Sequence, residues 1–203
     1  MTMDTNSTIA FHFDFSSPYG YLASELVEDL AARHRRSVRW HPMLLGVVFK
    51  STGAVPLTSV PVKGDYSRRD FARSARFHGV PFRMPTRFPL ATQAAARIVL
   101  WRRDAGADVA PVVHALFRAF FRDDRDISSP DVAADVAAET GLARAEARAA
   151  VDDPAVKEAL RRENDAALAA GVFGSPFMFV DGEPFWGVDR FDQVERWLAG
   201  SGF

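Results

Sequence analysis

The chain contains 203 residues, of which 48% are hydrophobic and 25% charged, and its formal net charge at pH 7 is -1. This composition is typical of a globular protein with an ample core, and the near-zero charge gives no overall positive field that would favour nucleic acid. Cysteine is absent. The lack of thiols excludes disulfides, thiolate metal sites, cysteine nucleophiles and redox CxxC chemistry, so any sulfur chemistry must come from a ligand.

No segment of the sequence indicates export or insertion into a membrane. The N-terminal residues MTMDTNST contain neither a basic nor an apolar segment, and no apolar run approaches the ~20 residues that a membrane span requires. A cytoplasmic location is therefore expected. The five histidines show no paired spacing, so no metal site is expected.

The N-terminal part of the chain predicts a strand, a helix and a second strand. Residues 8–15 alternate, with a phenylalanine or isoleucine at every second position, which is typical of a strand. Ser17 fits a helix N-cap and Pro18 the first helical position, and helical spacing continues to Arg33. Residues 37–45 predict the next strand, which a crossover helix would place parallel to the first.

The middle of the chain predicts only helices after one loop. Residues 50–63 are rich in Gly, Pro, Ser and Thr and are expected to form that loop. Beyond it, caps, prolines and glycines delimit helical patterns over residues 66–78, 92–104, 111–121, 130–140 and 154–170. The proline-rich stretch VPFRMPTRFPL between the first two helices is expected to be an ordered loop.

The C-terminal part returns to strands. Phe177–Val180 and Glu183–Trp186 are expected to pair through the two-residue turn Asp181-Gly182, and an amphipathic helix containing Phe191 then closes the chain.

The order of these elements is β-α-β, then a helical block, then β-β-α. Without the block, this is the order of a thioredoxin fold. The predicted fold class is therefore α/β, thioredoxin-like, with a large all-helical insertion between the two halves. The expected domains are a discontinuous thioredoxin-like domain of residues 7–50 and 171–203 and a helical insertion of residues 51–170.

Ser17 is the first candidate for a functional residue, and its position allows two interpretations. As an N-cap, its hydroxyl would accept a hydrogen bond from the first helical turn, which is a purely structural role. Alternatively, the hydroxyl and the positive end of the helix dipole would stabilise a ligand thiolate, since such surroundings lower a thiol pKa of about 8.5 by one or more units. Neighbouring Ser16 is expected to belong to the end of the strand.

Two stretches near the C-terminus are further candidates. In GVFGSP (residues 171–176) a proline directly precedes a strand. This stretch is either an ordinary loop or, with a cis peptide bond before Pro176, a place where the backbone of Ser175 is free to pair with a peptide-like ligand. In WGVDR (residues 186–190), Asp189 is either the N-cap of the last helix or the acceptor of a ligand ammonium.

Together these stretches resemble the 2-hydroxychromene-2-carboxylate isomerases and the kappa-class glutathione transferases. The resemblance is carried by FDFSSPYGYLA (residues 13–23), GVFGSPFMFVDGEPFWGVDR (residues 171–190) and the intervening PVKGDYSRRDF, GVPF and FP (within residues 61–89). Both families belong to a branch of thioredoxin-like proteins that includes DsbA-type disulfide oxidoreductases. In these isomerases and transferases a serine, here Ser17, stands where the redox relatives carry the first cysteine of CxxC.

The resemblance implies bound glutathione as the cofactor. Its thiol would face Ser17, and its backbone would pair with Ser175 before a cis-Pro176. Val172 would flank the peptide. Its γ-glutamyl end would meet Val188, Asp189 and Arg190.

The other end of the ligand and the substrate are assigned less directly. A charge at the glycyl end of glutathione would be met by Lys50 or Lys63. The residues expected on the substrate side are Lys50, Phe88 and Trp186, and Phe49 and Phe82 are further candidates for an aromatic wall. The expected partners are a small aromatic carboxylate and a second copy of the chain in a homodimer.

The sequence departs from the family pattern at two positions. Members commonly have an asparagine in the loop after the second strand, where Ala54 stands here, and the amide contact is lost. The usual Val-Pro-Thr is Ser175-Pro176-Phe177, and the larger Phe177 is expected to narrow that wall. Both departures concern the identity of the substrate more than the fold.

The resulting hypothesis is a glutathione-dependent isomerase of a 2-hydroxychromene-2-carboxylate-like aromatic substrate, acting by reversible thiolate addition and elimination. Ser17 would stabilise and orient the thiolate and would not itself be the nucleophile. One alternative is a kappa-class-like glutathione S-transferase that consumes glutathione at the same site. The other is a non-catalytic thioredoxin-like binding module in which Ser17 and Asp189 are only helix caps.

Overall fold

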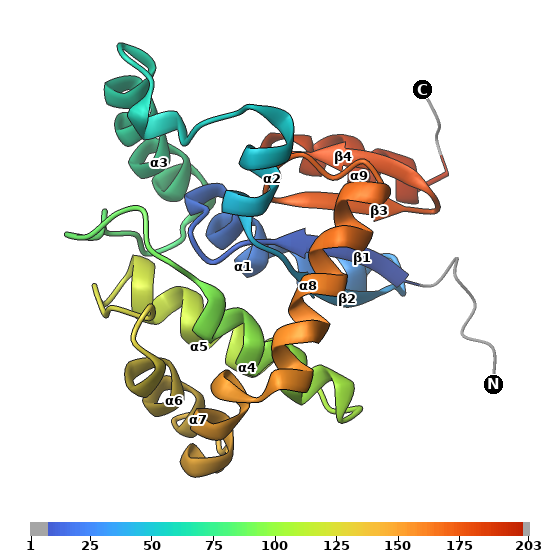
Figure 1. The fold of residues 1–203 in the computed structure, drawn as a ribbon. Helices are drawn as coiled ribbons and strands as arrows, with labels where there is room; N and C mark the ends of the chain where they lie inside the picture. Colours follow the sequence, from blue (N-terminus) through green and yellow to red (C-terminus); the bar gives the residue numbers. More distant parts are fainter. Residues whose placement is uncertain (1–7, 201–203) are drawn as a thin grey trace.

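The computed structural model describes residues 8–200, and a four-stranded sheet lies at its centre (Figure 1). Its strands are β1 (Thr8–Phe13), β2 (Ser37–Pro42), β3 (Phe177–Val180) and β4 (Glu183–Trp186), in the order β2-β1-β3-β4. β2 is parallel to β1, β3 is antiparallel to β1, and β4 is antiparallel to β3. This topology confirms the thioredoxin-like fold class expected from the sequence.

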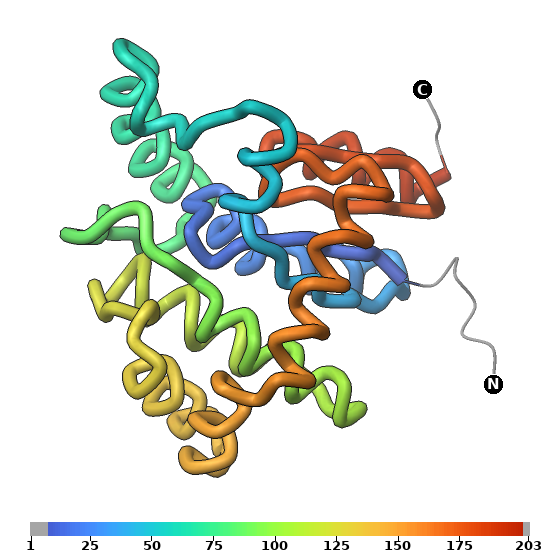
Figure 2. Tube along the Cα trace, viewed as in Figure 1, coloured from blue at the N-terminus to red at the C-terminus, as the bar shows by residue number. Residues whose placement is uncertain are grey.

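Helices connect and cover the strands. They are α1 (Pro18–Arg33), α2 (Leu45–Thr52), α3 (Lys63–His78), α4 (Gln93–Asp104), α5 (Ala110–Phe121), α6 (Pro130–Ala138), α7 (Arg144–Asp152), α8 (Pro154–Ala169) and α9 (Phe191–Leu198), with short 3₁₀ turns η2 (Leu57–Ser59) and η3 (Val188–Arg190). α1 and α9 lie on one face of the sheet and α8 crosses the other (Figure 1). The trace in Figure 2 leaves the sheet after β2, passes through α2 to α7 and returns along α8.

One hydrophobic core joins the sheet to the inserted helices. The rings of Phe13 and Phe15, at the end of β1, have their centroids 5.6 and 4.6 Å from that of Phe117 in α5. Tyr21 of α1 stacks on Phe121 of α5 at 5.4 Å. Because these rings are buried together, the position of α5 relative to the end of β1 is set by close packing. The division of the chain into two domains stays a prediction.

Two helices were not predicted from the sequence, and some element ends are shifted. β1 and β2 end at Phe13 and Pro42, and the Met43 N–H donates the next hydrogen bond between the two segments, to the Phe13 carbonyl oxygen (2.8 Å). The prediction of a loop over residues 50–63 is wrong at both ends, since α2 runs to Thr52 and α3 begins at Lys63. α7 was missed because its buried face consists only of small residues, namely Ala147, Ala150 and Val151.

Parts of two sequence predictions fall outside the described residues. The absence of a leader was predicted from a segment that includes residues 1–7. The predicted thioredoxin-like domain begins at residue 7 and includes residues 201–203. Within residues 8–200, no helix has the length and apolar character needed to cross a bilayer. The same residues contain no group of three or more His, Asp or Glu side chains placed to hold a metal ion.

The face of the sheet beneath α8 contains two histidines. His12 of β1 stacks on His41 of β2 with ring centroids 4.6 Å apart, and His41 Nδ1 lies 2.5 Å from Oε1 of Glu163 in α8. Arg103 of α4 donates two hydrogen bonds to the same glutamate, at 2.9 and 2.8 Å. Burial, followed by the neighbouring His41, lowers the pKa of His12 to about 3. His12 is therefore neutral in the folded protein at neutral and mildly acidic pH.

Replacing His12 with phenylalanine is expected to flatten the acid side of the stability profile. The unfolded wild-type chain takes up a proton at His12 near pH 6.5, whereas the folded protein does so only near pH 3. The free energy of unfolding therefore falls as the pH decreases through this window, by up to about 1.4 kcal/mol per pH unit, and the variant lacks this term. Urea denaturation at about pH 7.5 and about pH 5 should show a loss larger by about 2 kcal/mol in the wild type. Equal losses in the two proteins would contradict a neutral, buried His12.

Candidate active site

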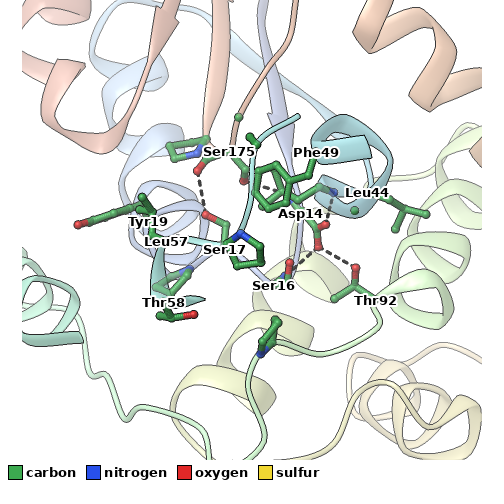
Figure 3. Close-up of a pocket in the computed structure, with 18 of the residues that line it drawn as sticks. Asp14, Ser16, Ser17, Tyr19, Leu44, Phe49, Leu57, Thr58, Thr92 and Ser175 are labelled. Atoms are coloured by element: carbon green, nitrogen blue, oxygen red, sulfur yellow. Dashed lines mark hydrogen bonds between the residues drawn. The ribbon is translucent and has the colours of Figure 1, made fainter. Parts of the chain in front are cut away.

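A cavity of about 1010 Å³ lies between the end of β1 and the inserted helices. Its walls come from the β1–α1 turn, α2 and the residues that follow it, α3, residues 88–93, residues 173–176 and residues 186–190. Figure 3 shows Ser17 beside Ser175 in this cavity, and Asp14 between Ser16 and Thr92. Segments that are far apart in the sequence thus meet at one site.

Ser17 is both a helix cap and part of the cavity wall. Its hydroxyl accepts a hydrogen bond from the Gly20 N–H (2.9 Å) and donates one to the Ser175 carbonyl oxygen (2.8 Å). α1 begins here because Ser17 has an extended backbone and Pro18 has no N–H that needs a partner. The first turn of α1 contains no acidic side chain, so nothing in that turn offsets the positive end of the helix dipole. The structural interpretation of Ser17 is therefore correct, and it does not exclude the functional one.

Ser175 and Pro176 lie on the wall next to Ser17, and the peptide bond between them is cis, as predicted. The expectation that the Ser175 carbonyl is free is wrong, because it accepts the hydrogen bond from Ser17. The Ser175 hydroxyl oxygen in turn accepts a hydrogen bond from the Asp14 N–H (3.0 Å). These two contacts hold the start of β3 against the end of β1 and the start of α1.

Val188, Asp189 and Arg190 form η3 at another side of the cavity. Asp189 is not the N-cap of α9, since that position is occupied by Arg190 and no side chain caps the helix. Instead, the Asp189 carboxylate pairs with the Arg190 guanidinium at 3.2 Å, with side-chain exposures of 70% and 44%. An ion pair this exposed contributes little to stability, so a ligand that carries both charges can exchange partners with it at small cost.

Aromatic side chains form much of the remaining wall. Phe49, Phe88 and Trp186, which the sequence analysis assigned to the substrate side, all line the cavity. Trp186 lies directly over the backbone of Gly174, where a Cβ atom would be only 2.3 Å from the indole Nε1. Because Gly174 has no side chain, the Trp186 indole can lie against its backbone and form part of the cavity wall.

The basic side chains among the described lining residues are those of Lys50 and Arg190. Arg190 pairs with Asp189, whereas Lys50 forms no ion pair with any residue in the described part of the chain. Ala54 also lies on the wall. The asparagine that the resemblance led us to expect at that position would have added an amide to the cavity, and this chain offers a methyl group instead.

Four predicted residues do not line the cavity. The side chains of Val172 and Phe177 are 1% and 3% exposed and pack with Met43, Val48 and Ala167 beneath α8. The expectation that Phe177 narrows the wall is therefore wrong. Phe82 stacks on Phe121 in the main core, and Lys63 begins α3 away from the cavity.

The sequence analysis missed Asp14, the buried carboxylate of the site. Its side chain is 3% exposed and accepts hydrogen bonds from the Ser16 N–H (2.8 Å), the Leu45 N–H (2.5 Å) and the Thr92 hydroxyl (2.7 Å). Burial raises the pKa of Asp14. The available signal was a charged residue within the apolar run FHFDF at the end of a predicted strand.

A second polar group on the wall was also missed. The Tyr19 hydroxyl donates a hydrogen bond to the Asp70 carboxylate, which also pairs with Arg73. Burial and then the contact with Asp70 raise the pKa of Tyr19, so the phenol stays protonated at neutral pH. Helical spacing alone does not reveal that α3 passes beside the start of α1.

Comparisons with known proteins agree with this geometry. A family model described as a DSBA-like thioredoxin domain matches residues 8–199. The 2-hydroxychromene-2-carboxylate isomerase of Sphingobium xenophagum is 31% identical over 198 residues, covering 94% of this chain and 97% of that relative. The glutathione S-transferase kappa 2 of Caenorhabditis elegans is 26% identical over 212 residues, covering 97% and 94%. A solved structure of a 2-hydroxychromene-2-carboxylate isomerase superimposes with a TM-score of 0.86 at 26% identity, covering 96% and 95%.

The fold, the cavity at the end of β1 and the family match define the class: the chain belongs to the DsbA-like thioredoxin family. Within this class, the resemblance to 2-hydroxychromene-2-carboxylate isomerases is confirmed by relatives that match almost the whole chain. These relatives are named as isomerases and glutathione transferases, which supports an enzymatic role.

Gly20 is expected to be required for the contact between the two serines. A Cβ atom at this position would lie 2.7 Å from the Ser175 Oγ and 3.0 Å from the Ser17 Cβ. Gly20→Ala should therefore lower the free energy of unfolding by about 1–3 kcal/mol, although alanine is the better helix former. Ser175→Ala in the same chain should recover part of this loss, because it removes the nearer of the two atoms. Urea denaturation of both single variants and the double variant measures the coupling, and simple additivity would contradict the contact.

Proposed function

We propose that the protein is a glutathione-dependent isomerase of a 2-hydroxychromene-2-carboxylate-like aromatic substrate. The observation that carries this proposal is the Ser17 hydroxyl at the positive end of α1, on the wall of a cavity that Ser175, Asp189 and Arg190 also line. Isomerases of this name from Sphingobium xenophagum and Pseudomonas putida, at 31% and 28% identity, support the reaction type.

The residues around the cavity fit a peptide with free charged ends. The exposed Asp189–Arg190 pair matches an ammonium and a carboxylate on one α-carbon. The Ser175 carbonyl is an acceptor for a peptide N–H. The cavity, at about 1010 Å³, is at the upper end of the roughly 300–1,000 Å³ range of ligand sites, so it has room for a tripeptide and a bicyclic aromatic together.

When bound, glutathione would supply a thiol whose thiolate adds reversibly to a conjugated carbon of the substrate. Ser17 stabilises and orients that charge. Its O–H donates to the Ser175 carbonyl in the structure, and rotation about the Cβ–Oγ bond directs the same hydrogen into the cavity. The rotation also releases the Ser175 carbonyl to accept an N–H from the peptide. The Ser17 oxygen keeps its bond from Gly20 throughout, so the donor stays in place.

The substrate is held by the aromatic side of the cavity. Phe49, Phe88 and Trp186 offer flat apolar surfaces to a bicyclic ring. This proposal assigns Lys50 to the substrate carboxylate. Ala54 lies on the wall near the start of the following loop and offers the substrate no hydrogen bond.

A second candidate function is a glutathione S-transferase of the kappa class. It is favoured by the kappa-class relatives from Caenorhabditis elegans and Rattus norvegicus, both at 26% identity over more than nine-tenths of this chain. The two candidates differ in the fate of the thiol. Titration of free thiol before and after turnover separates them, because an isomerase returns glutathione and a transferase consumes it.

Ser17→Ala is expected to lower the turnover of 2-hydroxychromene-2-carboxylate by about 100- to 1,000-fold, because it removes a donor to the charge on sulfur. Turnover is followed by the absorbance change of the substrate, with and without glutathione. The same substitution removes a helix cap and should cost about 0.5–2 kcal/mol of stability. A loss of activity must therefore be separated from a loss of folded protein.

Ser129→Ala is the matched control for the lost cap. Ser129 also precedes a proline at a helix start, accepts a hydrogen bond from the Val132 N–H (3.5 Å) and is not part of the cavity wall. This control should also lose stability, by a smaller amount because its cap bond is longer, and it should keep its turnover. Full turnover in Ser17→Ala would rule out the proposed role of the hydroxyl. Calorimetry with glutathione completes the test, since a non-catalytic module predicts no saturable binding.

A further inference from the structure

Asp14 lies where the walls of the cavity meet, and its carboxylate is shared by three donors (Figure 3). Oδ1 accepts hydrogen bonds from the Ser16 N–H and the Thr92 hydroxyl, and Oδ2 accepts one from the Leu45 N–H. The donors belong to three elements. Ser16 precedes α1, Leu45 is the first residue of α2, and Thr92 is the N-cap residue of α4.

The Asp14 carboxylate accepts hydrogen bonds from the starts of α2 and α4. The N-cap residue of α2 is Leu44, whose side chain cannot accept a hydrogen bond, so Asp14 takes the place of a local cap for that helix. Thr92 does not cap α4 with its own side chain, because its hydroxyl is directed to Asp14. Two helix starts that follow Asp14 by 31 and 78 residues are therefore attached to the end of β1.

The main chain of Asp14 connects the same point to Ser17. Its carbonyl oxygen accepts the Ser17 N–H (2.9 Å), and its N–H donates to the Ser175 hydroxyl (3.0 Å). The two serines of the proposed thiol site and the starts of α2 and α4 thus share one residue as their common support.

The three donors require an aspartate at this position. An asparagine has one oxygen and an NH₂ group. In either orientation the NH₂ group would face a donor, namely the Leu45 N–H or the pair formed by the Ser16 N–H and the Thr92 hydroxyl, and could not accept its hydrogen bond. In the described part of the chain, no cation pairs with Asp14, and a buried carboxylate without one is costly. The three hydrogen bonds offset the cost of burying this charge only when all three are made. The positions of the three donors around Asp14 are therefore tightly restricted.

We propose that Asp14 is a positioning residue that holds the substrate-side wall, defined as α2 and residues 88–93, at a fixed distance from Ser17. The proposal rests on the proposed function, because this wall carries Phe49, Lys50 and Phe88. The residues assigned to the charged end of the peptide, Asp189 and Arg190, receive no hydrogen bond from the carboxylate. Loss of Asp14 should therefore affect the substrate more than the peptide.

The test is Asp14→Asn, assayed with 2-hydroxychromene-2-carboxylate and glutathione. We expect the KM for the chromene to rise about tenfold or more and kcat to fall with it, while the Kd for glutathione, measured by calorimetry, stays within about twofold. Thr92→Val, which removes one donor and keeps the shape of the side chain, should raise the same KM by a smaller factor. Unchanged KM values in both variants would overturn the proposal, because a merely structural role alters the amount of folded protein and not the KM.

Hydrogen exchange without any ligand provides an independent readout. In Asp14→Asn the amides of α2 should exchange faster, while those of β3 stay unchanged. Asp165→Asn is the matched control, because it removes an exposed carboxylate of α8 that lies outside the cavity, and it should change neither exchange nor KM.

If glutathione does not bind the wild type, the proposed function fails, and hydrogen exchange in α2 still tests the role of Asp14. If Asp14→Asn does not fold, Thr92→Val decides by the same two readouts.

Discussion

The hydrogen bond from the Ser17 hydroxyl to the Ser175 carbonyl joins residues 158 positions apart and sets the geometry of the site. It requires that the start of α1 approach β3 closely, which Gly20 permits because it has no side chain. A hydroxyl at this position cannot exchange disulfides. It can only donate or accept a hydrogen bond, so this chain, which has no cysteine, has a preorganised donor at a helix N-terminus. In the function that we propose, the thiol comes from glutathione.

The inserted helices matter to the site because they share a core with the sheet. Phe117 and Phe121 of α5 pack against Phe13, Phe15 and Tyr21, so the insertion is held by close-packed rings beside the end of β1. Packing of this kind resists small displacements. A cavity between the sheet and the insertion therefore keeps its walls at set distances, and the hydrogen bonds of Asp14 refine the position of the nearest helix starts.

Local signals in the sequence were sufficient to predict most helices and strands and to identify the residues closest to the proposed thiol. Alternation predicted β1, and Ser17 followed by Pro18 predicted the start of α1, because both patterns act between neighbouring residues. α2 was missed for the opposite reason. The residue before it is Leu44, and the group that satisfies its first N–H is Asp14, far away in the sequence.

The sequence by itself determined the thioredoxin-like class, which follows from the order of the elements. Short motifs in the sequence also identified Ser17, Ser175 and Asp189 as candidate site residues. Only the tertiary structure decided that Val172 and Phe177 face a buried cluster and not the cavity, and that Asp14 supports the site. The physical reason is that burial and long-range hydrogen bonds depend on which distant segments meet. A single strand or loop, taken alone, does not specify which of its faces will meet a cavity and which will meet the core.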